Sequence, residues 1–422
     1  MLASQRVAVA GLRAVDAADR VGETVREPAI SALVECAERV FVLCVGKSGA
    51  ALMKGIKGNI CRPVDRTMVV GAAGYPRAEA DFAAVGDHPF PGLRSARAAA
   101  GLRAFLGECE FTADDLVLVG VSGGATAMLA DPVPPLGHGD LHAVSAELLG
   151  SGIDVTEANS LRRALSRLHA GGLLDHLRPA RAVGLVVSDN VQIGDAGVAS
   201  GLTFPGPVDL DRAADVAGRC LRDPGLRHRV LAALATAPGV RGRGACVSNF
   251  HVTGGDAAVE AMARHAADAG FDVVSLGGRV QGPVTEVAER FARLLTAGRA
   301  RPALVVGAGE VTVELRGDGQ GGRCQELAWR VGLALDGLPG TGFAAVASDG
   351  VDFLPRSSGA WVDGGSVARA AAAGIAVEAA LAVNDTYPAH AALGQIIRHA
   401  PGRTNVCDLY VGFAGGEPPE RP

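Results

Sequence analysis

The sequence contains few lysines and no run of basic residues. Lys47, Lys54 and Lys57 lie within one short segment, and arginine supplies the rest of the cationic charge. The formal net charge is −5 at pH 7. Because nucleic-acid binding needs a basic patch or stripe, we expect no nucleic acid as a partner. A small anionic substrate needs only local positive charge, which this composition allows.

Long hydrophobic runs and ordered cysteine patterns are also missing. No stretch reaches the roughly 18 apolar residues of a membrane span, and the N-terminus lacks a signal-peptide pattern. The eight cysteines form no C-x-x-C pair and have no histidine at zinc-finger spacing. Scattered thiols of this kind are typical of reduced, intracellular proteins. We therefore expect a cytoplasmic protein with no membrane partner.

Aromatic residues are scarce, at 4% of the chain, whereas hydrophobic residues make up 48%. The cores should therefore consist of Ala, Val, Leu and Ile. The 58 glycines fall in short clusters after apolar runs, which indicates structured loops. A chain of 422 residues exceeds the size of most single domains, so we expect two.

Short apolar runs alternate with helical stretches rich in Ala, Arg and Leu, a pattern typical of parallel α/β sheets. The strands expected first are residues 40–45, 68–71, 116–121 and 182–187. The composition changes around residues 205–245, where prolines flank an Arg-rich helical segment, and we place the domain boundary near 235. The sequence predicts an α/β protein of two domains: a Rossmann-like parallel sheet in residues 1–235 and a smaller mixed α/β domain in 236–422.

The second half is expected to form its own α/β unit, without an internal repeat. Its expected strands are 245–252, 272–276, 303–306, 311–315 and 343–347, and its expected helices are 256–267 and 284–295. Two glycine loops, at 307–310 and 317–323, should flank the strand at 311–315.

Residues 46–49, Gly-Lys-Ser-Gly, follow the first expected strand and open a helix. Such a turn directs backbone N–H groups at one spot, where the helix dipole also favours negative charge. The turn is not a Walker A loop, because Phe41 stands where that motif needs glycine. Lys47 could reach phosphate oxygens from here, or could be an ordinary surface lysine.

A second glycine turn, Ser122-Gly123-Gly124, follows the strand at 116–121 and should lie at the same sheet edge. It could bind an anion or serve only tight packing. Residues 120–124 also satisfy the G-x-S-x-G pattern of hydrolases, with His88 or His251 as partner, although nothing else in the sequence supports a hydrolase.

Polar residues follow other expected strands. Asp189 could take a hydroxyl proton or bind Mg²⁺, or could cap a turn. Asp349 and Asp352 form a similar acidic pair, compatible with a metal site or a plain turn. Arg323 ends the glycine loop at 317–323, where a guanidinium suits bidentate phosphate recognition, or a solvated hairpin.

In their order along the chain, these segments resemble the glycerate 2-kinase family, whose C-terminal half carries the domain called MOFRL. The resemblance covers nearly the whole chain. It rests on residues 46–47, 86–89, 115–124, 159–166, 188–189, 199–203, 309–310, 321–326, 348–352, 384–387 and 402–408.

The resemblance implies a two-domain enzyme with an interdomain site. It would bind ATP and Mg²⁺ and transfer the γ-phosphoryl group to the 2-hydroxyl of D-glycerate. The catalytic residues implied are Lys47, Asp189 and Arg323. The residues implied in substrate or phosphate binding are Ser122, Gly123, Gly124, Arg162, Glu310 and Asn405; those for the metal are Asp349 and Asp189. The partners are ATP and a small hydroxy acid; a homodimer is compatible with the sequence.

Departures from the family pattern leave the acceptor open. Ala125-Thr126 replaces Gly-Ser, Leu202 replaces proline, Cys324 replaces asparagine, and His169 stands where the family has lysine. A lost cation is compatible with a different hydroxy acid or sugar acid as acceptor.

Two other classes remain as alternatives. An NAD(P)-dependent hydroxypyruvate reductase would fit the strand–glycine–helix units, but no G-x-G-x-x-G follows the first strand. A binding protein without turnover would fit the altered loops but not the retained charged residues. The sequence leaves open the acceptor's identity and stereochemistry, the hydroxyl phosphorylated, the oligomeric state, and whether Asp189 is base or metal ligand.

Overall fold

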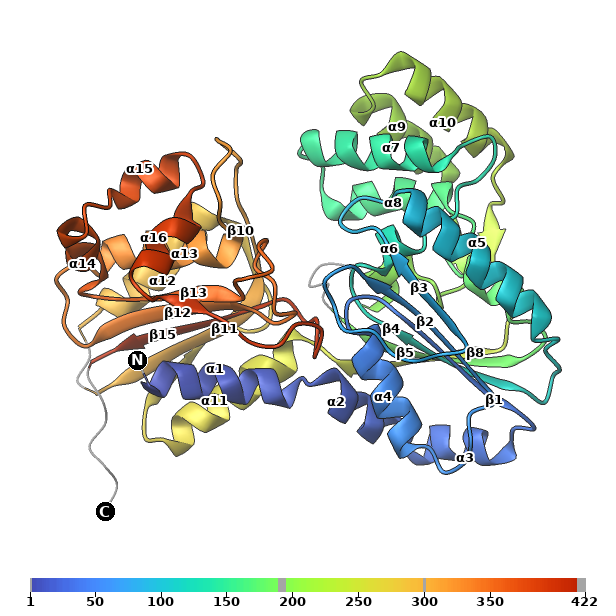
Figure 1. The fold of residues 1–422 in the computed structure, drawn as a ribbon, viewed down its shortest axis with the longest axis horizontal. Coiled ribbons are helices and arrows are strands. Elements are labelled where there is room, and N and C mark those ends of the chain that lie inside the picture. The colour runs from blue at the N-terminus through green and yellow to red at the C-terminus, as the bar shows by residue number, and fades with distance from the viewer. Residues whose placement is uncertain (1, 189–194, 299–300, 416–422) are drawn as a thin grey trace. The chain divides into compact units, whose positions relative to one another are not determined.

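A computed structural model describes residues 2–188, 195–298 and 301–415, in two compact units (Figure 1). The N-terminal unit is Ala17–Thr253, and the C-terminal unit joins Met1–Asp16 to Gly254–Pro422. The expected boundary at 235 falls instead in the last turn of helix α10 (Pro224–Thr236). Both units are α/β, so the predicted fold class is confirmed.

The N-terminal unit is built on a six-stranded sheet, in the order β3-β2-β1-β4-β5-β8, with all strands parallel. The strands are β1 (Val40–Val45), β2 (Arg66–Ala72), β3 (Phe82–Gly86), β4 (Leu116–Val121), β5 (Arg181–Val187) and β8 (Val247–Thr253). Every residue of β1 and β4 is buried, as expected for central strands covered on both faces. Their continuous Val and Leu runs explain why the sequence predicted both exactly.

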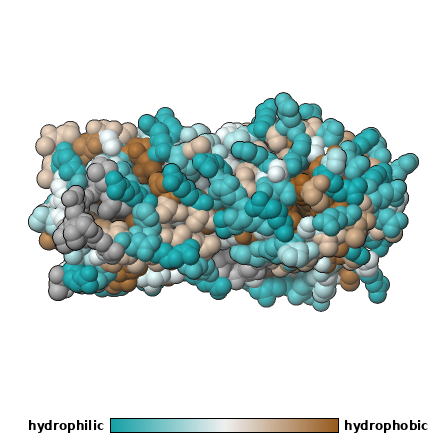
Figure 2. Space-filling model, turned by 90° about the horizontal axis from the view of Figure 1, so that it is seen from below, coloured by the Kyte–Doolittle hydropathy of each residue, from teal (hydrophilic) through white to brown (hydrophobic). Residues whose placement is uncertain are grey.

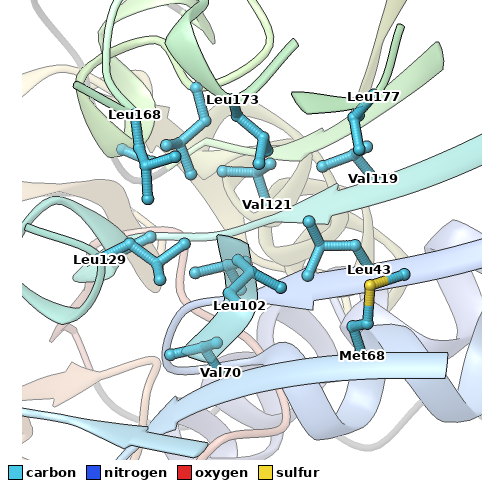
Figure 3. Packing of buried hydrophobic residues seen from close by; sticks show 14 of the residues in the cluster. Leu43, Met68, Val70, Leu102, Val119, Val121, Leu129, Leu168, Leu173 and Leu177 are labelled. Carbon is cyan, nitrogen blue, oxygen red and sulfur yellow. The ribbon is translucent and has the colours of Figure 1, made fainter. Parts of the chain in front are cut away.

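Helices cover both faces of this sheet. They are α2 (Ala17–Val25), α3 (Pro28–Cys36) and α4 (Gly49–Asn59), together with α5 (Leu93–Glu108) and α6 (Ala125–Met128). Figure 3 shows Leu102 of α5 among Leu43, Val70 and Val121, which come from three strands. This packing fixes the strand ends from which the loops of the candidate site emerge.

Four further helices pack around an apolar cluster of their own. They are α7 (His138–Gly150), α8 (Val155–Leu165), α9 (Leu210–Cys220) and α10. The helical segment expected at 205–245 accounts for α9 and α10. Short elements complete the unit: η1 (Gly172–His176), η2 (Asp195–Ser200), β6 (Gly206–Pro207) and β7 (Val240–Arg241).

Strand β8 corrects one prediction. The run at 245–252 was expected in the second half, but β8 pairs in parallel with β5 and completes the N-terminal sheet. Without β8, the buried strand β5 would present an open edge of unpaired backbone groups. The proline-rich composition change before β8 therefore marks a crossover connection and not the end of the unit.

The C-terminal unit contains a mixed seven-stranded sheet, in the order β10-β11-β15-β12-β13-β14, with β9 also paired to β11. The strands are β9 (Asp272–Ser275), β10 (Val280–Pro283), β11 (Ala303–Thr312), β12 (Thr341–Ala347), β13 (Gly359–Asp363), β14 (Ile396–Ile397) and β15 (Asp408–Ala414). The last strand in the chain, β15, lies between β11 and β12 and is antiparallel to both.

Strand β11 corrects a second prediction, because it runs through Gly307-Ala308-Gly309 without a loop. The glycines permit close approach of the neighbouring strand. A Cβ atom on Gly309 would lie 1.9 Å from the Val280 carbonyl oxygen, and one on Gly307 would lie 3.0 Å from a Val280 side-chain carbon. A glycine pair inside a strand can thus signal packing and not a turn.

Helices on the two faces complete this unit: α1 (Leu2–Ala14), α11 (Gly255–Asp268), α12 (Val284–Thr296), α13 (Arg323–Ala334), α14 (Ser366–Ala372), α15 (Val377–Ala382) and α16 (Thr386–Ala392). One face buries Phe291 of α12 against Phe343 and Tyr410 of the sheet. On the other, Gly11 of α1 lies close to Met262 of α11 and Leu409 of β15. The first helix of the chain is therefore part of the C-terminal core.

The face of the molecule in Figure 2 carries mostly hydrophilic residues, with hydrophobic ones scattered among them. Within the described residues, no helix combines the length and the apolar character needed to cross a membrane.

Candidate functional site

The strand order of the N-terminal unit places Lys47 at a special point of the sheet. Successive strands run outward from β1 to β2 and β3, and the chain then returns to β4 on the other side of β1. In open parallel sheets, ligands bind beyond the carboxyl ends of the strands at such a switch point. Lys47 follows β1 and Ser122 follows β4, so both turns lie there.

The two turns are hydrogen-bonded to each other. The Lys47 amide donates to the Gly123 carbonyl at 3.1 Å, and the Ser48 amide donates to the Ser122 Oγ at 3.1 Å. Gly46 has φ +119°, and a Cβ atom there would lie 2.3 Å from the Ser122 Oγ. The turn therefore requires glycine at 46. Helix α4 begins at Gly49, directly beyond it.

The Lys47 side chain is half-buried, and its ammonium lies 6.0 Å from the centre of the Tyr75 ring. Contact with an aromatic face reduces the freedom of a long side chain and leaves its charge intact. The turn thus holds a cation at the sheet edge beside the start of a helix, an arrangement suited to phosphate.

Ser122 links the turns and is not an exposed nucleophile. It is fully buried, its amide donates to the Val45 carbonyl at 2.9 Å, and its Oγ accepts from Ser48. The G-x-S-x-G elbow of hydrolases needs an exposed serine hydroxyl. The structure therefore contradicts the hydrolase alternative and gives Ser122 a positioning contact to the Lys47 turn.

A pocket opens beside Gly124, where about 200 Å³ of space can be occupied by water. Its walls come from the segment after β3 and from α6, α7, α8 and the segment after α8. They are His88, Pro89, Pro91, Gly124, Thr126, Ala127, Ala130, Leu141, Val144, Ser145, Arg162, Leu165, Ser166 and His169. The pocket thus joins the second glycine turn to Arg162, two features that the sequence predicted separately.

Arg162 lies in this wall without an ion-pair partner among the described residues. One guanidinium nitrogen donates to Asn159 Oδ1 at 3.3 Å. Burial lowers the pKa of Arg162, because little in its surroundings compensates its charge. A guanidinium in this state favours an incoming anion.

His169 lies in the same wall and is 2% exposed. Its Nδ1 atom lies 3.4 Å from the carbonyl oxygen of Arg162, which can only accept, so Nδ1 carries the proton. Burial lowers the pKa of His169 to about 3, so the ring is neutral near pH 7. Its Nε2 atom is buried and has no hydrogen-bond partner among the described residues. The residue that replaces the family's lysine is thus an uncharged acceptor.

Arg241 supports this wall and was missed from the sequence. It is 2% exposed and donates to the carbonyl oxygens of Arg163, Ala164, Ser166 and His169, the second at 2.9 Å. Burial lowers the pKa of Arg241 to about 10. This role was not apparent from the sequence, because Arg241 opens the run Arg-Gly-Arg-Gly at 241–244, and such a run is typical of an exposed linker.

In the C-terminal unit, Arg323 is the first residue of α13 and is tightly paired. It donates to Asp408 of β15 through Nε at 2.6 Å and NH2 at 3.1 Å, and to Glu310 of β11 through NH1. Burial alone would lower the pKa of Arg323, but Asp408 and Glu310 raise it well above its usual range. Burial also raises the pKa of Asp408 to about 6, although Arg323 acts to lower it. Two of the predicted residues, Arg323 and Glu310, are thus in direct contact.

The acidic pair after β12 divides into two roles. Asp352 is 2% exposed and accepts from the amides of Cys324 at 3.1 Å and Gln325 at 3.0 Å, so it caps α13. Asp349 accepts from the Val351 amide at 2.9 Å. Its carbonyl accepts from Gly402, which ties its loop to the loop that carries the buried Asn405. Only Asp349 of the pair remains a candidate metal ligand.

No cluster of three or more His, Cys, Asp or Glu residues with metal-binding geometry occurs in the described parts of the chain. Magnesium commonly uses one or two carboxylates together with substrate phosphates and water, so a single Asp349 carboxylate fits that donor chemistry. Asp189, the predicted base or metal ligand, lies outside the described residues.

Comparison with known families supports the two-part organisation. Residues 3–235 match the family model described as Domain of unknown function (DUF4147), and residues 303–408 match the MOFRL family.

Individual relatives and a solved structure extend this match over nearly the whole chain. A protein of Agrobacterium vitis named "Putative hydroxypyruvate reductase" is 30% identical over 390 residues, 89% of this chain and 100% of its own. Human glycerate kinase is 29% identical over 354 residues, 72% of this chain and 68% of its own. The crystal structure of glycerate kinase from Thermotoga maritima superposes with a TM-score of 0.81 at 23% identity, covering 97% of this chain and 98% of that one.

Proposed function

The chain belongs to the glycerate kinase type 2 family, and from that premise we propose that it is an ATP-dependent glycerate 2-kinase. It would transfer the γ-phosphoryl group of ATP to the 2-hydroxyl of D-glycerate, giving 2-phosphoglycerate and ADP. The oxygen of that hydroxyl attacks phosphorus, the bond to the β-phosphate oxygen breaks, and the hydroxyl proton passes to a base.

One observation carries the proposal: Lys47 stands at the switch point of a parallel sheet, on a turn held rigid by Ser122 and Gly123. Catalysis of phosphoryl transfer consists mainly of positioning and electrostatic stabilisation. A cation fixed before the reaction loses no energy to reorganisation as charge develops on the transferred group. Lys47 is therefore assigned to the phosphates, with Gly123 and Gly124 as backbone donors beside it.

The remaining predicted residues receive roles that fit their surroundings. Arg162 would bind the acceptor, because its charge is uncompensated among the described residues. Arg323, oriented by Glu310 and Asp408, has further N–H groups to offer to phosphate oxygens. Asn405 would hydrogen-bond phosphate or substrate. Asp189 stays the candidate base or second metal ligand on sequence grounds alone.

Asp349 would hold Mg²⁺ through one carboxylate oxygen. The bound metal would neutralise charge on the β- and γ-phosphates. We further expect the enzyme to act in the cytoplasm.

The relatives' names bring a reductase forward as a second candidate. The residues of the first βαβ unit give it little support. The Lys47 and Ser48 amides are bonded to the β4 turn and are not available to a pyrophosphate. A dinucleotide-binding fold places an acidic residue at the end of the second strand, where it binds the ribose. Strand β2 ends at Ala72, and the residues that follow are Ala73 and Gly74, neither of which is acidic.

The test measures two reactions with one preparation. ADP release is followed with ATP, Mg²⁺ and a panel of D-glycerate, L-glycerate and larger sugar acids, and NADH or NADPH oxidation is followed with hydroxypyruvate. We expect ADP release with D-glycerate and no oxidation of either nucleotide. Reductase turnover without ADP release would overturn the proposal, whereas ADP release led by a larger acid would correct the acceptor alone.

A further inference from the structure

The pocket beside Gly124 combines the guanidinium of Arg162, the buried ring of His169 and apolar walls. Its lining also includes His88 and three hydroxyl side chains, those of Thr126, Ser145 and Ser166. Arg162 brings a guanidinium that has no carboxylate partner within the described residues. His169 brings a buried Nε2 atom that has no hydrogen-bond partner in the part of the chain that the structure describes. Leu141 and Val144 of α7 and Leu165 of α8 form the apolar walls. A buried polar atom without a partner, as at His169 Nε2, calls for an explanation, and a bound ligand is one.

The guanidinium of Arg162 and the ring of His169 recognise different groups of a ligand. The free N–H groups of a guanidinium pair with a carboxylate, commonly through two parallel bonds. The Nε2 atom of His169 can only accept, because the ring is neutral and its one proton lies on Nδ1. It therefore recognises a donor, such as a hydroxyl group. A carboxylate and a hydroxyl on one small molecule make a hydroxy acid.

We propose that this pocket is the acceptor site, in which Arg162 holds the carboxylate of a singly charged hydroxy acid and His169 accepts from its terminal hydroxyl group. The assignment rests on the proposed function for the identity of the acceptor. The space of about 200 Å³ is more than ten times the roughly 10–15 Å³ needed by one water, so a three- or four-carbon acid fits.

Because the His169 ring is neutral, we also expect ligands with a second anionic group to bind more weakly in this pocket. Arg162 is the one arginine or lysine among the described residues that line the pocket, so a second anionic group on the ligand would be desolvated without a second such cation in the wall to pair with it. Tartronate is the matched probe, because it is glycerate with a carboxylate in place of the terminal CH₂OH. D-lactate is the probe for the hydroxyl contact, because it lacks the terminal hydroxyl.

Isothermal titration calorimetry of the full chain, without ATP, measures binding of these three acids. We expect D-glycerate to bind about tenfold more tightly than tartronate, a difference of roughly 1.4 kcal/mol. Arg162→Gln should weaken D-glycerate binding at least tenfold, and His169→Phe should remove the preference for D-glycerate over D-lactate. His169→Lys should bring tartronate within about twofold of D-glycerate, since it supplies the second cation.

Two matched controls lie on exposed positions of the same helical layer. Arg219→Gln on α9 removes a surface guanidinium paired with Asp215 and Glu157, and His228→Phe on α10 removes an exposed imidazole. Both should bind D-glycerate as the wild type does. The tighter tartronate binding of His169→Lys is a gain that misfolding cannot produce, so it decides the case if Arg162→Gln proves unstable.

ADP release, measured in parallel, separates this inference from the proposed function. If ADP forms with D-glycerate but the Arg162 and His169 variants keep the wild-type KM and dissociation constants, the pocket assignment is wrong and the kinase stands. If no acid yields ADP but binding responds to the variants as described, the pocket assignment stands and the kinase is wrong.

Discussion

Two arginines of the C-terminal unit and two arginines beside the pocket of the N-terminal unit have different kinds of partner. In the C-terminal unit, Arg323 is paired with Glu310 and Asp408, and Arg330 is paired with Glu326 at 2.7 Å. In the described part of the N-terminal unit, Arg162 and Arg241 are in no ion pair and contact amide or carbonyl oxygens only.

The presence or absence of an ion-pair partner decides whether a guanidinium is mainly held in place or mainly attracts anions. A paired guanidinium is held in place, and its charge is largely cancelled. An unpaired one keeps a field that attracts anions. Arg162 should therefore contribute to anion binding, whereas the ion pairs of Arg323 and Arg330 should contribute mainly to the stability of their unit.

The largest expected effect concerns Lys47, the cation at the switch point of the N-terminal sheet. Lys47→Ala should lower kcat for ADP release by roughly 10²–10³-fold, because it removes a fixed cation from the developing charge. Lys57→Ala, on the exposed face of α4, is the control and should keep wild-type kinetics. Wild-type turnover in the Lys47 variant would move the chemistry away from the switch point.

The next effect concerns the ion pair between Arg323 and Asp408. Arg323→Gln leaves Asp408, which is 1% exposed, without its cation and should lower the free energy of unfolding by about 3 kcal/mol. The double variant with Asp408→Asn should recover much of that loss, because no buried charge is left unpaired. Denaturant titrations of both variants decide the point. An equal loss in the single and double variants would mean that the pair does not stabilise this unit.

A smaller effect concerns pH. The pKa of Asp408 is about 6 in the folded protein, above its ordinary value of 3.8, so the folded state retains a proton that the unfolded state releases. This contribution to stability is complete below about pH 4 and is lost as the pH rises to about 6. Asp408→Asn should flatten the unfolding free energy over that interval. Asp363→Asn is the control, because the hydrogen bonds from Arg369 and Gly365 outweigh burial and lower the pKa of Asp363. An unchanged slope in Asp408→Asn would place the titrating group elsewhere.

The smallest effect sharpens the description of the two glycine turns. Ser122→Ala deprives the buried Ser48 amide of its acceptor and should cost about 1–2 kcal/mol of stability. Ser31→Ala, whose hydroxyl bonds Glu35 on an exposed face, should cost less than about 0.5 kcal/mol. Thermal unfolding measures both. Equal values would show that the bond between the turns is not significant.

Much of the fold followed from patterns that the sequence displays directly. The strands at 40–45 and 116–121 are unbroken apolar runs, so their bounds were predicted exactly, and the family resemblance is confirmed. Strand β8 and the continuous β11 were assigned wrongly. In both cases the deciding factor is the neighbouring strand, which local composition does not reveal.

Individual residues of the candidate site could be predicted from the sequence, but the contacts between them could not. Lys47, Arg162 and the glycine turns could be named, but their roles stay predictions. The burial of His169 Nε2, which has no hydrogen-bond partner among the described residues, and the carbonyl contacts of Arg241 arise from the packing of segments far apart in the chain. No spacing rule contains that information.

The most direct measurement of the central claim is ³¹P NMR of the product formed from ATP, Mg²⁺ and D-glycerate by the full chain. We expect a single phosphomonoester, identified as 2-phosphoglycerate by addition of the authentic compound. A product phosphorylated at the 3-position, or no phosphomonoester at all, would contradict it.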